Sequence, residues 1–182
     1  GRWQPTPPSY MDAVEPHWCE IRTLVMDSAS QFKPVAPYPF SIDKNSAFYK
    51  EAKETYDTGN RIAEKLIAVE KAKSELIPEE SAIATFWDCN PYATVTQGHM
   101  MFAKKKNTPD AHWINIAKIA LKKSNSDFET AIFTNTITSI GIFESFISCW
   151  DGKFSTNVIR PETYINLYID ENWRPQLQTP PF

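Results

Sequence analysis

The sequence predicts an all-α protein, and three observations lead to this prediction. Apolar residues recur at spacings of three and four along several stretches, which is the period of an amphipathic helix. Glycine is scarce, with 5 residues against 14 prolines, so glycine turns and glycine-rich phosphate loops are disfavoured relative to helices joined by stiff connectors. Proline followed by acidic residues, a pattern typical of helix starts, occurs at three boundaries of these stretches.

Size and charge restrict the class of protein further. The chain has 182 residues, of which 42% are hydrophobic and 23% are charged, which is typical of a folded domain and excludes disorder as the main state. The net charge of −3 provides no global positive field, so we expect no nucleic-acid partner and only a local anion site. Polar residues interrupt the most apolar stretch, residues 131–150, which therefore fits a buried helix and not a membrane span. Three widely spaced cysteines predict neither a zinc site nor a disulfide framework.

Residues 1–41 are rich in proline and aromatic residues. Proline blocks helix formation, while exposed aromatic rings require a surface to pack on. We therefore expect an ordered N-terminal arm that wraps over a helical body formed by residues 42–182, in preference to a floppy tail.

The first half of the body is expected to contain two helical stretches. Residues 45–73 have apolar side chains at helical spacing, and Gly59 is expected to break them into two helices or one kinked helix. Pro78 and the two glutamates after it predict a helix that runs to about Cys89.

A turn and two further helices are expected next. Asn90 and Pro91 mark the turn, and residues 97–106 are consistent with a short helix. Thr108, which precedes a proline, is an N-cap signature for a helix to about Lys123.

The second half of the body is expected to contain the central helix. Ser126 or Asp127 starts this helix, which is apolar on both faces and runs to about Trp150. Pro161 opens a further helix through about Tyr168, and the remaining residues are polar and proline-rich.

Lys153 and Arg160 are the candidate binding residues between these two helices. In a continuous helix they would lie about 10 Å apart on nearly the same face, whereas Pro161 pushes Arg160 out of the helical region to the start of a new helix. A compact ammonium and a planar guanidinium together suit a tetrahedral oxyanion such as phosphate or vanadate. The alternative is that both are solvated loop charges.

The residues around this pair carry a family resemblance. Trp150-Asp-Gly-Lys153, followed by Asn157-Val-Ile-Arg160-Pro161, resembles the first signature of the vanadium-dependent haloperoxidase and type 2 phosphatidic acid phosphatase superfamily. That signature is a lysine, six residues and then arginine-proline, after a mostly apolar helix. The long helix without membrane spans resembles the soluble bacterial haloperoxidase-like branch, and residues 171–182 resemble the segment that leads into the second signature.

The resemblance implies a helical bundle of the haloperoxidase and acid phosphatase type. In it, Lys153 and Arg160 would bind the equatorial oxygens of vanadate, or of phosphate in a phosphatase, and Trp150 is a possible pocket wall or a core residue. The second family signature, serine-glycine-histidine, and the third, arginine followed after five residues by histidine, are both absent from the 182 residues. We therefore expect residues 42–182 to be the N-terminal part of a truncated domain, inactive alone. Its partner would be the missing C-terminal part of the same protein, either in one polypeptide or as a separate chain.

The resemblance leaves two chemistries open. In the haloperoxidase form, vanadate is the cofactor and the substrates are peroxide and halide. In the phosphatase form, a histidine attacks a phosphate ester and no cofactor is needed. The alternative from another class is a non-catalytic helical binding or scaffold module. Localisation stays open, with export to the periplasm or beyond favoured and no signal peptide in this sequence.

The remaining candidate residues are expected to be structural. Gln97-Gly98-His99 superficially resembles the second signature but precedes the lysine, so His99 is expected at a helix start. We expect a solvated face formed by Lys104–Lys106, Lys118, Lys122 and Lys123. His17 and His112 are expected at the surface or packed against the arm. Glu129 and Glu144 lie on one helix without the histidine partners that a carboxylate metal site requires.

Overall fold

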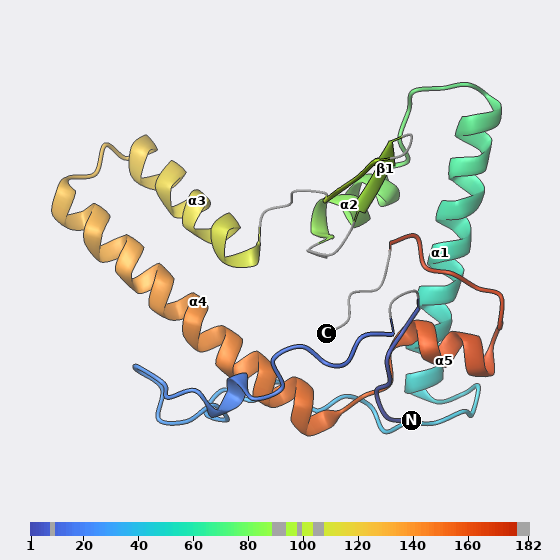
Figure 1. The fold of residues 1–182 in the computed structure, drawn as a ribbon, viewed down its shortest axis with the longest axis horizontal. Helices are drawn as coiled ribbons and strands as arrows, with labels where there is room; N and C mark the ends of the chain where they lie inside the picture. Colours follow the sequence, from blue (N-terminus) through green and yellow to red (C-terminus); the bar gives the residue numbers. More distant parts are fainter. Residues whose placement is uncertain (8–9, 89–93, 98–99, 104–107, 178–182) are drawn as a thin grey trace. The chain divides into compact units, whose positions relative to one another are not determined.

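The computed structural model describes residues 1–7, 10–88, 94–97, 100–103 and 108–177, and they are mainly helical (Figure 1). This confirms the all-α prediction. In chain order the elements are η1 (Trp18–Glu20), α1 (Ala47–Lys71), α2 (Glu79–Trp87), β1 (Thr94–Gln97), β2 (Met100–Ala103), α3 (Pro109–Lys123), α4 (Phe128–Thr156) and α5 (Pro161–Tyr168). Among the described helices, none has the length and apolar character that crossing a bilayer requires.

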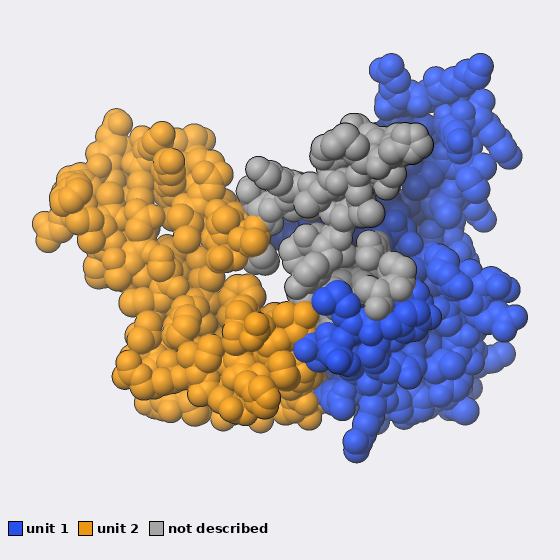
Figure 2. Space-filling view, in the orientation of Figure 1, with its two compact units in different colours: residues 1–13, 36–93, 157–182 blue, residues 14–35, 94–156 orange. Residues whose placement is uncertain are grey.

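The chain forms two compact units (Figure 2). Unit 1 comprises residues 1–13, 36–93 and 157–182, and unit 2 comprises residues 14–35 and 94–156. Residues 1–41 are thus divided between the units and are not a separate body. The division into an arm of residues 1–41 and a domain of residues 42–182 stays a prediction.

Local capping explains where several helices begin. The Ser46 hydroxyl accepts a hydrogen bond of 3.1 Å from the Tyr49 N–H at the start of α1. Thr108 accepts from the Ala111 N–H at 3.4 Å, which confirms the predicted N-cap of α3. Because each cap satisfies an amide that has no partner within the helix, these starts are specified by local sequence.

Two predictions about secondary structure need correction. Gly59 does not divide its stretch into two helices, because α1 runs through it as one helix. A Cβ at this position would lie 2.8 Å from the Trp173 ring, so the glycine allows close packing of that indole and does not end the helix. The short helix expected over residues 97–106 is also wrong, because β1 and β2 form an antiparallel pair there. The β-branched residues Thr94, Val95 and Thr96 favour the strand.

The core of unit 1 forms around Tyr164, which is fully buried. Its hydroxyl donates a 2.6 Å hydrogen bond to the carbonyl of Ser41. Buried Ala52 and Ile159 belong to the same cluster. Four aromatic rings surround that of Tyr164, with centroids between 5.0 and 6.4 Å away, those of Phe40, Phe48, Tyr49 and Tyr168.

In unit 2 a buried carboxylate attaches residues 24–26 to α4. Glu144 is only 6% exposed and accepts hydrogen bonds from three consecutive backbone N–H groups, of Leu24 at 2.5 Å, Val25 at 3.2 Å and Met26 at 3.1 Å. Burial raises the pKa of this carboxyl, but the three donors outweigh burial and the net pKa lies below its ordinary value. Glu144 therefore has a structural role as an anchor.

We expect Glu144→Gln to lower the melting temperature of the full-length protein by several degrees at neutral pH. A carboxylate with a lowered pKa stabilises the fold fully above its ordinary pKa of 4.5, and this stabilisation is lost as the pH falls through the folded-state value. The variant should therefore lose less stability on acidification than the wild type. Thermal unfolding by circular dichroism across the acidic range measures both effects. Glu129→Gln, an exposed carboxylate on the same helix, is the control, and identical pH profiles for the two variants would contradict the anchor role.

Candidate oxyanion-binding site

The two candidate cations lie on either side of the junction between α4 and α5. Helix α4 extends to Thr156, beyond the end predicted near Trp150, and this extension places Lys153 in its last turn. Arg160 is the N-cap residue of α5. Lys153 belongs to unit 2, whereas Arg160 belongs to unit 1. The convergence of the two side chains on one anion therefore stays a prediction.

The backbone between the helices follows the sequence signals. Asn157 has φ 47°, a left-handed conformation that asparagine tolerates and that commonly ends helices. Arg160 is extended, with φ −70° and ψ 148°. This confirms that Pro161 moves the preceding residue out of the helical region.

Lys153 and Trp150 interact within the last turns of α4. The Lys153 ammonium lies over the Trp150 ring, 4.8 Å from its centroid, a cation–π contact between residues three positions apart. Trp150 is buried at 7% exposure, its indole N–H donates to the Val14 carbonyl at 3.3 Å, and its ring packs 5.0 Å from that of Trp18. Trp150 is therefore a core residue whose ring supports the candidate lysine, and its role as a pocket wall stays a prediction.

The glycine of the motif allows residues from the N-terminal part to pack beside Lys153. Gly152 is buried in α4, and a Cβ there would lie 3.3 Å from the Pro34 ring. Next to it, Asp151 lies 3.6 Å from the Lys33 ammonium. The Asp-Gly pair thus fixes this end of α4 against residues 33–34.

Arg160 has an incomplete set of hydrogen-bond partners. Its Nε and Nη2 atoms are buried and donate no hydrogen bond to any described residue. Burial lowers the pKa of the guanidinium, and the charge of Glu162 partly offsets this effect, although an arginine stays protonated at neutral pH. A buried, charged donor without an acceptor is costly and calls for an explanation.

An oxyanion would supply the missing acceptors. Nε–H and Nη2–H form one edge of the planar guanidinium, the edge that binds two oxygens of a carboxylate, phosphate or vanadate side by side. The donor set consists of N–H groups on a cationic residue. It therefore fits vanadate or phosphate and would repel a metal cation.

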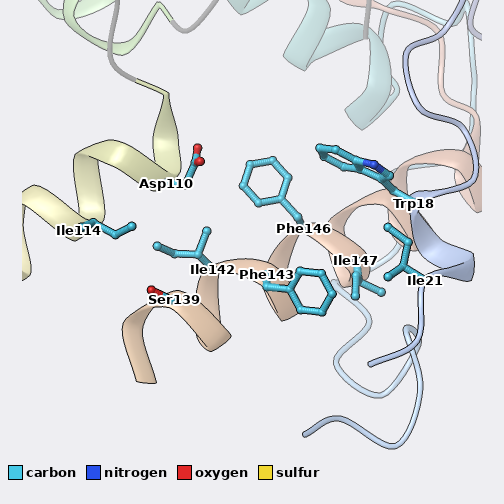
Figure 3. Close-up of a pocket in the computed structure, with 9 residues that line it drawn as sticks. All are labelled: Trp18, Ile21, Asp110, Ile114, Ser139, Ile142, Phe143, Phe146 and Ile147. Carbon is cyan, nitrogen blue, oxygen red and sulfur yellow. The ribbon is translucent and has the colours of Figure 1, made fainter. Parts of the chain in front are cut away.

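An apolar pocket between α3, α4 and residues 18–21 of unit 2 does not have this chemistry. It has a volume of about 410 Å³ and is lined mainly by isoleucine and aromatic side chains from α3, α4 and residues 18–21 (Figure 3). Its polar groups are Asp110 and Ser139. A carboxylate repels anions, so this pocket does not suit an oxyanion.

The other polar residues considered above do not assemble into a second site. His17 is exposed and pairs with Glu20 at 2.8 Å, and the His112 ring lies 6.0 Å from that of Trp113. No cluster of metal-ligating side chains occurs in the part of the chain that the structure describes. Of the residues expected to be structural, four more are exposed: Glu129, Lys118, Lys122 and Lys123. The predictions for His99 and Lys104–Lys106 concern residues outside the described part of the chain. Cys19 and Cys149 are free thiols.

Sequence reasoning missed the roles of two residues. Glu144 was visible as a carboxylate within an apolar helix, but nothing in the chain indicated the backbone amides that it binds. Trp3 lies next to Arg160, with its ring centroid 5.7 Å from the guanidinium carbon. No local signal connects residues so distant in sequence.

Comparison with known proteins identifies a relative. The chain is 53% identical to a protein whose crystal structure is described as that of the first bacterial vanadium-dependent iodoperoxidase, with a TM-score of 0.85. The match covers 100% of this chain and 40% of that chain. No protein-family model matches the chain, and no curated protein matches it significantly.

Proposed function

We propose, from this relation to a vanadium-dependent iodoperoxidase and from the resemblance that it confirms, that the chain is the N-terminal part of a haloperoxidase-like enzyme and contributes two cations to its vanadate site. The relative spans more than twice the length of this chain. The remaining part of the enzyme, including its serine-glycine-histidine and arginine-histidine signatures, is proposed to lie outside these residues.

The observation that carries the proposal is the unsatisfied edge of Arg160. The guanidinium is half-buried, and two of its nitrogens donate to no described residue. A non-catalytic helical scaffold gives no reason to bury a charge without an acceptor. An oxyanion site does, because the bound anion completes the hydrogen bonds that the protein leaves open.

Lys153 and Arg160 would have complementary roles in this site. The guanidinium would bind two oxygens of the anion through its Nε–H and Nη2–H, which would fix the orientation of the anion. The ammonium, which lies over the Trp150 ring, would neutralise negative charge on the anion. Bound vanadate supplies the capacity to activate peroxide for halide oxidation. This chain's residues would supply preorganised positive charge, which stabilises the bound anion without further rearrangement.

Binding and turnover measurements on the full-length protein test the proposal. We expect vanadate to bind, phosphate to compete for the same site, and peroxide-dependent iodide oxidation to require vanadate. Vanadate-independent hydrolysis of phosphomonoesters would instead favour the phosphatase form. Absence of both binding and turnover would favour the scaffold alternative. Residues 1–182 alone are expected to show no turnover.

We expect Lys153→Ala in the full-length protein to weaken vanadate binding about tenfold, because one positive charge is removed from the site, a loss of roughly 1.4 kcal/mol. Isothermal titration calorimetry measures the dissociation constant. The matched control is Lys118→Ala, which removes an exposed helical lysine on α3 and should leave the affinity unchanged. Equal affinities for the two variants would remove Lys153 from the site.

A further inference from the structure

The first residues of the chain pair with the segment that precedes Arg160. Arg2 forms an isolated antiparallel bridge with Val158, and the Trp3 N–H donates to the Asn157 carbonyl at 3.2 Å. Thr6, a few residues later, is buried at 4% exposure. Residues 2–6 are therefore built into unit 1 beside the connector.

This pairing brings the Trp3 indole against the guanidinium. The Arg160 carbon Cζ lies over the Trp3 ring, 5.7 Å from the centroid, within the range of a cation–π interaction. Trp3 is partly buried, so its ring also replaces water on one side of the charge. The Arg160 edge formed by Nε and Nη2 has no acceptor among the described residues.

An indole in this place has two physical effects on an arginine that binds an anion. It restricts the rotamers of a long and otherwise flexible side chain, so less freedom is lost when the anion binds. It also excludes water, which strengthens the attraction between the guanidinium and an anion. Both effects raise oxyanion affinity without any contact between the indole and the anion.

We propose that Trp3 is a positioning residue for oxyanion binding, acting through the guanidinium of Arg160. This inference rests on the proposed function, since it requires Arg160 to bind the anion. The role needs an aromatic face at position 3. A phenylalanine therefore preserves most of it, whereas a leucine of similar apolar character does not.

The test uses the full-length protein and titration with orthovanadate. Trp3→Leu is expected to raise the vanadate dissociation constant about tenfold, and Trp3→Phe about threefold or less. Trp113→Leu removes an indole that is 55% exposed on α3 and should leave the constant unchanged. Melting temperatures of the vanadate-free variants are recorded in parallel to separate altered binding from altered folding.

A double-mutant cycle tests whether Trp3 acts through Arg160. Trp3→Leu should add little to the loss caused by Arg160→Ala, because the indole then has no guanidinium to orient. Two outcomes would overturn the positioning role alone. The first is that the losses of vanadate affinity from the two substitutions add in the double variant. The second is that Trp3→Leu binds vanadate as tightly as the wild type while Arg160→Ala binds it weakly. Wild-type affinity in Arg160→Ala would overturn the proposed function together with this inference.

Discussion

Arg160→Ala in the full-length protein is expected to weaken vanadate binding about a hundredfold, the largest loss expected from any single change in this chain. The substitution removes a charge and a pair of parallel N–H donors, and charge-assisted hydrogen bonds contribute roughly 1.5–3 kcal/mol each. The guanidinium has no acceptor for Nε and Nη2 among the described residues. The anion therefore does not compete with an acceptor from those residues for these two N–H groups. Equilibrium titration with vanadate, and with phosphate as competitor, measures the loss.

The stability of the vanadate-free protein provides the matched control. Arg160→Met keeps a long side chain against Trp3 but removes the desolvated charge, so the melting temperature should stay the same or rise. The wild type should gain thermal stability on adding vanadate, whereas the Met variant should not. A variant that unfolds at a much lower temperature without vanadate would indicate that Arg160 mainly supports the fold.

Tyr164→Ala is expected to destabilise unit 1 by about 3–5 kcal/mol, the largest effect on folding. The side chain is fully buried, and its ring contacts four other aromatic residues, so truncation leaves a cavity that these rigid rings cannot fill. The Ser41 carbonyl also loses its 2.6 Å hydrogen bond. Urea unfolding of the full-length protein, followed by circular dichroism, measures the change in free energy of unfolding.

Tyr164→Phe separates packing from hydrogen bonding. It keeps the ring but removes the hydroxyl, so we expect a loss of about 1 kcal/mol. Burial raises the pKa of Tyr164, consistent with a neutral phenol that serves as a donor. If the alanine and phenylalanine variants were equally stable, the aromatic cluster would not be the source of stability in unit 1.

The helix starts were predictable because their signals are local. A proline precedes the first residue of α2 and is the first residue of α3 and α5, and the Thr108 cap lies next to the helix that it begins. The extended backbone of Arg160 follows from Pro161 in the same way. Such features depend on interactions within one turn, which the order of residues specifies directly.

The errors occurred where distant residues decide the outcome. Gly59 was expected to break or kink its helix, but α1 runs through it as one helix, and the Trp173 ring packs on the glycine. The central helix was expected to end near Trp150. Pro34 packs on the buried glycine, and the helix continues to Thr156. At both glycines a side chain from a distant segment packs where a Cβ would lie, a contact that the local sequence does not indicate.

The order of residues alone predicts the helical class, the junction between α4 and α5, and the placement of Lys153 and Arg160 at that junction, because spacing and proline position are properties of the chain. The surroundings of the charged groups depend on the folded structure: the Trp3 ring over Arg160, the Trp150 ring under Lys153, and the three amides around Glu144. The physical reason is that burial and hydrogen bonding of a charge depend on segments far away in the chain. Those segments meet only when the fold forms.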